Sequence, residues 1–246
     1  MTRSPIVRTW LDDCIIADNF AGGGGASTGI ETALGRSPDI AVNHDPEAIT
    51  VHKANHPSTK HFLESVWKVD PAEACGGKKV ALAWFSPTCT HFSKAKGTAL
   101  DASSIRIRGL AWVAVRWAAA VKPRVIALEN VEEFEKWGPL YRTHGEGCPG
   151  VACLKRCVCG TKSKDKRGRS IRVATHSTGC PGVACADGCH IHKPIKSREG
   201  ETFRAFVKKL RRFYKNVEWR LLRASEYGAP TTRRRLFLLA SDEPIK

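Results

Sequence analysis

The sequence predicts an α/β fold in which helices cover a mostly parallel sheet, with a Cys-rich insertion in the second half of the chain. Short apolar runs alternate with helix-like stretches through the first half, which is typical of βαβ units. A glycine-rich turn follows the first apolar run, where ligands bind in many sheets of this kind. A length of 246 residues suits one such domain with an insertion.

The predicted strands are apolar runs that end at polar or Gly/Pro-rich turns, and the predicted helices lie between them. The first four strands are Cys14–Ala17, Ile40–Val42, Val80–Phe85 and Val125–Leu128. The helices between them are Thr28–Leu34, Pro46–Ala54 and Gly109–Val121. Near the end of the chain we expect a helix at Thr202–Phe213 and strands at Val217–Leu222 and Leu236–Ala240.

The α/β pattern stops near residue 140 and resumes near residue 199. We therefore divide the chain into a core at residues 1–140, an insertion at 141–198 and the rest of the core at 199–246. The insertion has few large apolar residues and contains a repeat. The pattern His-x3-Cys-Pro-Gly-Val-Ala-Cys-x3-Cys starts at His144 and again at His176.

The Cys-rich repeat predicts a metal site. Thiolates and imidazoles in groups of four suit tetrahedral zinc, which can supply the folding energy that a segment without a core lacks. We expect two structural zinc sites; an iron–sulfur cluster or a redox-sensitive loop without metal are the alternatives. The expected ligands are Cys148, Cys153, Cys157, Cys159, Cys180, Cys185, Cys189 and His192.

The composition indicates a polyanionic partner. Forty Lys and Arg residues against 24 Asp and Glu give a formal net charge of +16, which favours nucleic acid over an anionic membrane surface. No stretch approaches the roughly 18 apolar residues of a membrane span, and the N-terminus lacks the apolar region of a secretory signal. We therefore expect a cytoplasmic location without membrane partners, where ten cysteines act as ligands, nucleophile or core residues before disulfides.

A glycine-rich segment runs from Asp18 to Gly29, after the first predicted strand. Glycines allow a sharp turn and a close approach to a ligand, and a helix N-terminus offers free N–H groups to an electronegative atom. Alone, this segment would fit a nicotinamide or flavin site equally well, or a tight turn without a ligand.

Cys89 follows the third predicted strand in the segment Ser86-Pro-Thr-Cys89. A cysteine just beyond the carboxyl end of a strand can point into a cleft, and the nearby Lys94 and Lys96 favour the nucleophilic thiolate. The alternative is a structural cysteine.

Two further motifs carry charged side chains. Glu129 lies at the end of the fourth predicted strand. Arg233 and Arg235 alternate at the start of the last strand, which places them on one face. Taken singly, the glutamate could be a surface ion-pair partner and the arginines a solvated charge run.

In this order and approximate spacing, the four motifs resemble those of the cytosine-C5 DNA methyltransferases. The resemblance implies a Rossmann-like, S-adenosylmethionine-dependent methyltransferase fold. Thr88 and Thr231 replace the family's usual proline and glutamine. Asn43 or Asp45 would contact the ribose, and Glu64 or Ser65 the adenine. The full set of implied cofactor residues is Asp18, Phe20, Gly22, Gly24, Gly25, Asn43, Asp45, Glu64, Ser65 and Pro87.

The resemblance also implies a mechanism. Cys89 would attack C6 of cytosine and so activate C5 for methylation. Glu129 would share a proton with N3, Arg235 would bind O2, and Arg233 would support Arg235 or a phosphate. The target base would have to leave the duplex to reach these groups.

Family members continue beyond the last motif seen here, through a target-recognition region and a final helix. A second chain is therefore possible for target recognition. The resemblance itself implies DNA as the partner, in a phage, prophage or restriction–modification setting. The alternatives are an RNA (tRNA) cytosine-C5 methyltransferase and an inactive or truncated nucleic-acid-binding relic.

Overall fold

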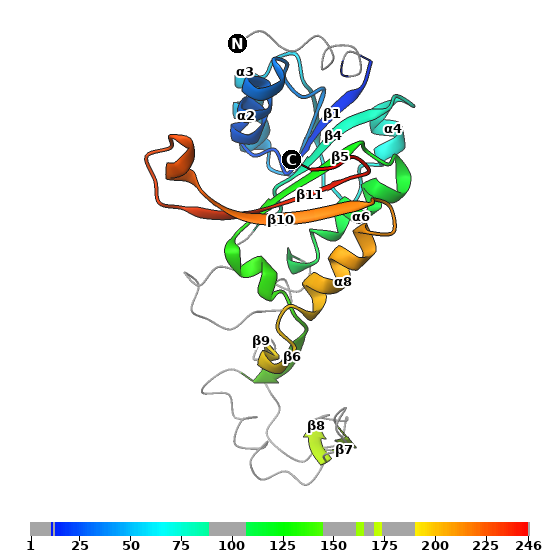
Figure 1. Ribbon diagram of the computed structural model, residues 1–246, viewed down its shortest axis with the longest axis vertical. Helices are drawn as coiled ribbons and strands as arrows, with labels where there is room; N and C mark the ends of the chain where they lie inside the picture. The colour runs from blue at the N-terminus through cyan, green and yellow to red at the C-terminus, as the bar shows by residue number, and fades with distance from the viewer. Residues whose placement is uncertain are drawn as a thin grey trace.

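The computed structural model describes residues 11, 13–88, 107–144, 161–164, 170–173 and 190–245. Its main feature is a seven-stranded sheet with the order β10-β11-β5-β4-β1-β2-β3 (Figure 1). The strands of this sheet are β1 (Ile15–Asn19), β2 (Ile40–Asn43), β3 (Lys60–Leu63), β4 (Val80–Phe85), β5 (Val125–Asn130), β10 (Asn216–Arg223) and β11 (Arg234–Ser241).

The sheet is mostly parallel, which confirms the predicted fold class. Strands β1 to β5 pair in parallel, and β11 is antiparallel to both β5 and β10. The chain builds outwards from β1 to β3 and then crosses to β4 on the other side of β1. Ligands of open α/β sheets bind at the carboxyl ends of the strands beside such a reversal.

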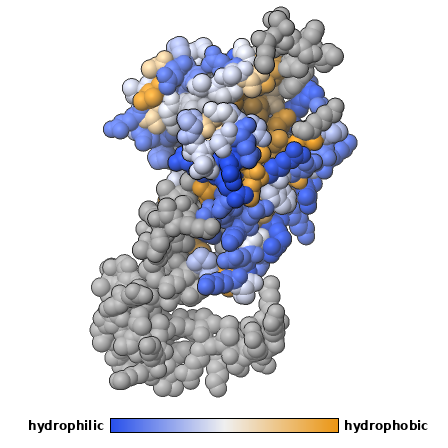
Figure 2. Space-filling model, turned by 60° about the vertical axis from the view of Figure 1, so that its left-hand side comes forward, coloured by the Kyte–Doolittle hydropathy of each residue, from blue (hydrophilic) through white to orange (hydrophobic). Residues whose placement is uncertain are grey.

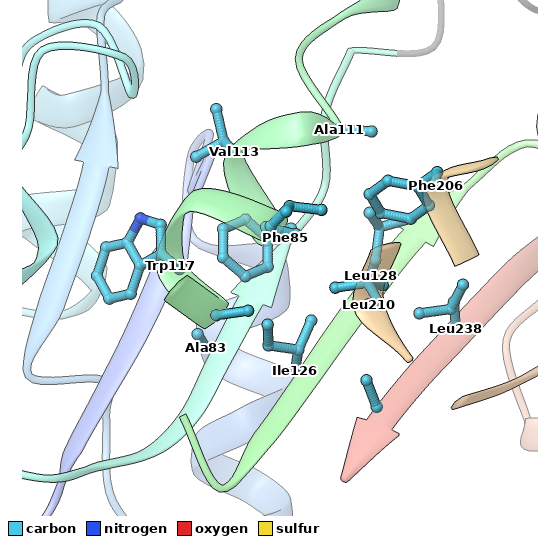
Figure 3. Close-up of a cluster of buried hydrophobic side chains, with 14 of the residues drawn as sticks. Ala83, Phe85, Ala111, Val113, Trp117, Ile126, Leu128, Phe206, Leu210 and Leu238 are labelled. Atoms are coloured by element: carbon cyan, nitrogen blue, oxygen red, sulfur yellow. The ribbon is translucent and has the colours of Figure 1, made fainter. Parts of the chain in front are cut away.

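Helices cover both faces of the sheet (Figure 1). A large apolar cluster joins one face to side chains from α6 and α8, including Trp117 and Phe206 (Figure 3). A smaller cluster on the other face includes Ile30 of α2 and Ile16 of β1. The helices are α2 (Gly25–Leu34), α3 (Pro46–Asn55), α4 (Pro71–Cys75), α6 (Trp112–Ala120) and α8 (Glu201–Leu210), with 3-10 helices η1 (Glu132–Lys136), η2 (Lys196–Arg198) and η3 (Ala224–Tyr227).

All six strands predicted from apolar runs are present, and most are longer than predicted. The structure extends β1 to Asn19 and β5 to Asn130, so the polar motifs at these strand ends belong partly to the strands themselves. It adds strand β3 and helix α4, which we did not predict. Strand β3 begins with Lys and His, and its two apolar residues are half-buried and exposed, so it lacks the apolar run of a central strand.

The described parts of the predicted insertion form two small antiparallel ladders. Strand β6 (Leu140–His144) pairs with β9 (His190–Pro194), and β7 (Thr161–Lys164) pairs with β8 (Ser170–Val173). The β6–β9 ladder joins the two ends of the segment, so the chain leaves and re-enters the core at neighbouring points.

Candidate active site

The glycine-rich turn lies at the carboxyl ends of β1, β2 and β4. The amides of Phe20 and Ala21 donate to the carbonyl of Val42, at 3.0 and 3.1 Å, and so fold the turn towards β2. On the other side, the Ser86 amide donates to the Asn19 carbonyl at 3.3 Å. The turn is therefore fixed between its two neighbouring strands.

The turn requires glycine at the positions that reverse the chain. Gly22 and Gly24 have φ values of 51° and 103°, a region that strains other residues. A Cβ atom at Gly25, the first residue of α2, would meet no atom within 4 Å. Backbone at the start of α2 is therefore open to a ligand, as expected of a cofactor-binding turn.

Asp18 lies beneath this turn and is fully buried. Its Oδ2 accepts a hydrogen bond from Ser27 Oγ at 2.7 Å, and its Oδ1 has no hydrogen-bond partner among the described residues. Burial raises the pKa of Asp18 to about 7, although the bond from Ser27 opposes the shift. Asp18 therefore supports the turn from inside the core and holds a proton more readily than a surface carboxyl.

The predicted ribose and adenine residues follow β2 and β3 and lie side by side, since the Glu64 amide donates to the Asn43 carbonyl at 3.1 Å. The Asp45 carboxylate caps α3 by accepting from two backbone amides. Glu64 Oε1 accepts from the Ser65 amide at 2.7 Å and lies 3.4 Å from Lys68 Nζ. The bond from Ser65 is the main cause that lowers the pKa of Glu64.

The segment that leads to Cys89 is anchored at Pro87. Asn130 Nδ2 donates to the Pro87 carbonyl at 3.2 Å, and Asn130 Oδ1 accepts from the Val131 amide at 2.9 Å. Cys89 itself lies outside the described residues. The segment that carries Cys89 therefore begins at the end of β4, which lies between β1 and β5 in the sheet.

Glu129 and Arg235 form an ion pair at the end of β5, with 2.8 Å between Arg235 Nε and Glu129 Oε1. Their side chains are 24% and 25% exposed, so a ligand can reach them. Burial raises the pKa of Glu129, and the charges of Arg235 and Arg233 oppose this shift. The pair thus combines a carboxyl that tends to keep a proton with a fixed guanidinium.

The middle arginine of the run has a different partner. Arg234 Nη1 lies 3.7 Å from Glu132 Oε2, while Arg235 pairs with Glu129. Arg233 is exposed, and its amide donates to Thr231 Oγ1 at 3.3 Å. Strand β11 begins at Arg234, so the alternation of side chains along a strand separates Arg234 from Arg235 but does not extend to Arg233.

Comparison with protein families gives a match that skips the insertion. The sequence profile of C-5 cytosine-specific DNA methylases matches residues 15–137 and 192–246. The chain belongs to this family. The matched ranges contain the glycine-rich turn, Cys89, Glu129 and both predicted arginines. A search of curated proteins gives no significant match.

Solved structures of low sequence identity share the fold. One is a proposed DNA modification methyltransferase encoded within a prophage (E. coli), with a TM-score of 0.55, 20% identity, and coverage of 93% of this chain and 46% of the other. The Dnmt2 methyltransferase of S. pombe has a TM-score of 0.52 at 15% identity, over 94% of this chain and 50% of the other. The Entamoeba histolytica methyltransferase EhMeth has a TM-score of 0.52 at 12% identity, over 95% of this chain and 54% of the other. This chain spans about half the length of these proteins.

Sequence patterns did not identify the side chains that connect the motifs. Asn19 Nδ2 donates to the Trp84 carbonyl at 3.3 Å, and Ser86 Oγ donates to the Phe20 carbonyl at 3.4 Å. Together with Asn130, they join the glycine-rich turn to the cysteine segment. A polar residue at the end of a buried apolar run was the available signal, but such residues are common in surface turns as well.

The predicted metal site lies almost wholly outside the described residues. The seven cysteines are among the residues not described, and only the backbone of His192 is described, in β9. Elsewhere in the described part of the chain, no group of three or more His, Cys, Asp or Glu side chains could hold a metal ion. Zinc binding therefore stays a prediction.

The sequence has no apolar stretch that predicts a membrane-spanning helix. Among the helices that the structure describes, none combines the length and the apolar character needed to span a bilayer.

Proposed function

We propose that this chain carries the catalytic part of a DNA cytosine-C5 methyltransferase, which transfers the methyl group of S-adenosylmethionine to a flipped-out cytosine. The observation that carries the proposal is the Glu129–Arg235 pair at the carboxyl edge of the sheet. This pair stands beside the strand that leads to Cys89, and the glycine-rich turn lies at the next strand on the other side of β4.

The residues at the turn fit S-adenosylmethionine. Its methionine part carries a carboxylate, which suits the open backbone at the start of α2. Asn43 and Asp45 both remain candidates for the ribose hydroxyls, since Asn43 Oδ1 accepts from the Asp45 amide at 3.0 Å and the Asp45 carboxylate caps α3. Glu64 and Ser65 both remain candidates for the adenine. When bound, the cofactor supplies an electrophilic methyl group on a sulfonium.

The base end of the site is formed by Cys89, Glu129 and Arg235, and each of these side chains has one task. The Cys89 thiolate forms a bond to C6, and the electron pair of the C5–C6 double bond becomes available at C5. Glu129 holds a proton at N3, and Arg235 donates to O2, so both counter the charge that accumulates on the ring. C5 would then take the methyl group that the cofactor supplies, with S-adenosylhomocysteine as the leaving group. A general base would accept the C5 proton, which restores the C5–C6 double bond and expels the Cys89 thiolate.

The charge of the chain suits a nucleic-acid substrate. The formal net charge is +16, and hydrophilic residues predominate on the described part of the face in Figure 2. Lysines and arginines give affinity for phosphates independently of base sequence. We propose duplex DNA as the substrate, in agreement with the family, and a tRNA substrate would contradict this choice.

A trapping experiment tests the reaction. Duplex DNA with 5-fluorocytosine at its cytosines should form a covalent adduct with the chain when it is co-expressed with a chain that carries the rest of a relative and S-adenosylmethionine is present, because fluorine at C5 blocks release of the cysteine. Cys89→Ser should form none, while its binding of S-adenosylhomocysteine stays unchanged. A normal rate of methylation by Cys89→Ser would exclude Cys89 as nucleophile.

The same assay tests whether a second chain supplies target recognition. We propose that a second chain does so. Adduct formation should then require co-expression with a chain that carries the rest of a relative. An equal adduct yield from this chain alone would contradict the proposal.

For residues 141–198, we propose two structural zinc sites. Metal analysis of protein purified without chelators should find about two zinc ions per chain. Cys148→Ser combined with Cys153→Ser should remove about one of them. A zinc content well below about one per chain would contradict the proposal.

A further inference from the structure

The last two turns of α3 contact the glycine-rich turn through side chains that no proposed step uses. Asn55 Nδ2 donates to the Gly23 carbonyl at 3.0 Å, and His56 Nε2 lies 3.2 Å from the Gly24 carbonyl. The Gly24 carbonyl also accepts from the amide and from Oγ1 of Thr28, at 2.8 and 3.0 Å, and Thr28 Oγ1 lies 3.2 Å from His56 Nε2, so His56 contacts both the carbonyl and the hydroxyl that binds it. We call Asn55, His56 and the adjacent His52 the α3 clamp.

His56 is packed directly against the turn. Its side chain is 2% exposed, and a Cβ atom at Gly24 would lie 2.9 Å from His56 Cδ2. The Nδ1 atom of the same ring is 3.2 Å from Glu31 Oε2 and 3.2 Å from Ser37 Oγ. The two sides of the ring thus have separate partners, since Nε2 faces the turn and Nδ1 faces the C-terminal half of α2 and the residues after it.

His52 extends the clamp into the core. It is fully buried, and its Nε2 lies 3.0 Å from Ser27 Oγ, which in turn donates to Asp18. Its Nδ1 lies 2.9 Å from His61 Nε2, on β3. Burial and the neighbouring His61 lower the pKa of His52 to about 4, so the neutral ring has one donor and one acceptor for these two partners.

These contacts are made to a segment whose ordering costs much conformational entropy. Glycine loses more conformational freedom on folding than any other residue, and four consecutive glycines form this turn. A turn that is ordered before the ligand arrives spares binding that entropic cost. The clamp holds the carbonyls of Gly23 and Gly24 on the α3 side, which leaves the start of α2 open.

We propose that Asn55 and His56, supported by His52, are positioning residues that hold the glycine-rich turn in its cofactor-binding conformation. The inference deepens the proposed function and rests on it for the identity of the ligand. The clamp itself does not depend on that identity, because its contacts join residues of the chain to one another.

Asn55→Ala is the first test, because Asn55 is exposed and its loss leaves the core intact. With the full chain, amide hydrogen exchange over Gly22–Gly25 should become about five- to tenfold faster, as expected for the loss of one hydrogen bond. The affinity for S-adenosylhomocysteine, measured by calorimetry, should fall by a similar factor. Lys53→Ala, an exposed change on the same helix, should alter neither quantity.

Two amide variants of His56 separate the roles of its ring nitrogens. Glutamine can place its amide group near the position of Nε2, and so keep polar contacts with Gly24 and Thr28; asparagine reaches only the position of Nδ1. His56→Gln should therefore retain slow exchange in the turn and near wild-type affinity. His56→Asn should lose the slow exchange and the affinity. This difference should persist even where the two variants unfold at the same urea concentration, that is, at equal stability. A purely structural role would move both variants together.

The outcomes distinguish this inference from the proposed function. Unchanged exchange in Asn55→Ala and equal exchange in both His56 variants would overturn the positioning role. If wild-type protein binds no S-adenosylhomocysteine, the cofactor assignment fails, and the exchange rates of the ligand-free chain still decide whether the clamp orders the turn.

Discussion

The two ends of the candidate site are built in different ways. At the cofactor end, backbone groups form the surface, Asn55 and His56 contact their carbonyls, and Ser27, His52 and Asp18 form a buried network beneath them. At the base end, the partly exposed side chains of Glu129 and Arg235 form the surface themselves. A substitution at the cofactor end should therefore change stability and binding together, whereas one at the base end should change the reaction alone.

Glu129→Gln should give the largest effect and the clearest separation of rate from stability. The amide keeps the shape but cannot exchange a proton with N3, so methyl transfer should fall by roughly 10²–10⁴-fold. The free energy of unfolding should change by less than about 1 kcal/mol, since the lost ion pair is partly exposed. Tritium transfer from labelled S-adenosylmethionine to DNA measures the rate. Glu47→Gln, an exposed change on α3, is the matched control.

Asp18→Asn should show the opposite behaviour, a pH-dependent change in stability. Because burial raises the pKa of Asp18 to about 7, its contribution to stability is fully present below its unfolded pKa. That contribution is lost as the pH rises towards 7, by about 1.4 kcal/mol per pH unit. The asparagine variant does not titrate, so it should gain roughly 2–3 kcal/mol on the wild type between about pH 5 and pH 8.

Urea unfolding at the two pH values measures this gain. The contribution of His52, whose pKa burial lowers to about 4, is common to both proteins and cancels in the difference. Asp13→Asn makes the same change at an exposed position and should show no such trend. A stability difference for Asp18→Asn that is the same at both pH values would mean that Asp18 is ionised in the folded chain at a normal pKa.

Arg234→Ala should give the smallest effect at either end. Arg234 pairs at 3.7 Å with Glu132, and both side chains are well exposed, so stability should change by at most about 1 kcal/mol. Methyl transfer by Arg234→Ala should exceed that of Arg235→Ala by at least about tenfold. Equal losses in the two variants would show that the alternation of the arginines does not separate their roles.

The positions of most strands and of the charged motifs could be predicted from the sequence because they depend on local pattern. The run Val80–Phe85 forms β4 with the predicted bounds, and Glu129 and Arg235 lie on adjacent strands. The contacts that support the site could not be predicted in this way. His52 and Ser27 are single polar residues on helices, and only packing brings them together with Asp18 beneath the turn.

Strand β3 was missed for a related reason. Its side chains are exposed or half-buried at the edge of the sheet, so its sequence has little of the apolar pattern that indicates a strand. The roles of Cys89 and of the Cys-rich repeat stay predictions, because both depend on residues outside the described ranges.

The pairing of β11 with β5 has a consequence for the order in which the chain folds. Glu129 precedes the long segment between β6 and β9, and Arg235 follows it, so the ion pair forms only after the last strand has been synthesised and inserted between β5 and β10. Such non-local pairing slows folding. The entropy of closing the intervening loop grows only with the logarithm of its length, by about 0.6 kcal/mol per doubling. A long insertion at the β6–β9 ladder therefore adds little to the entropic cost of bringing β5 and β11 together at the base end.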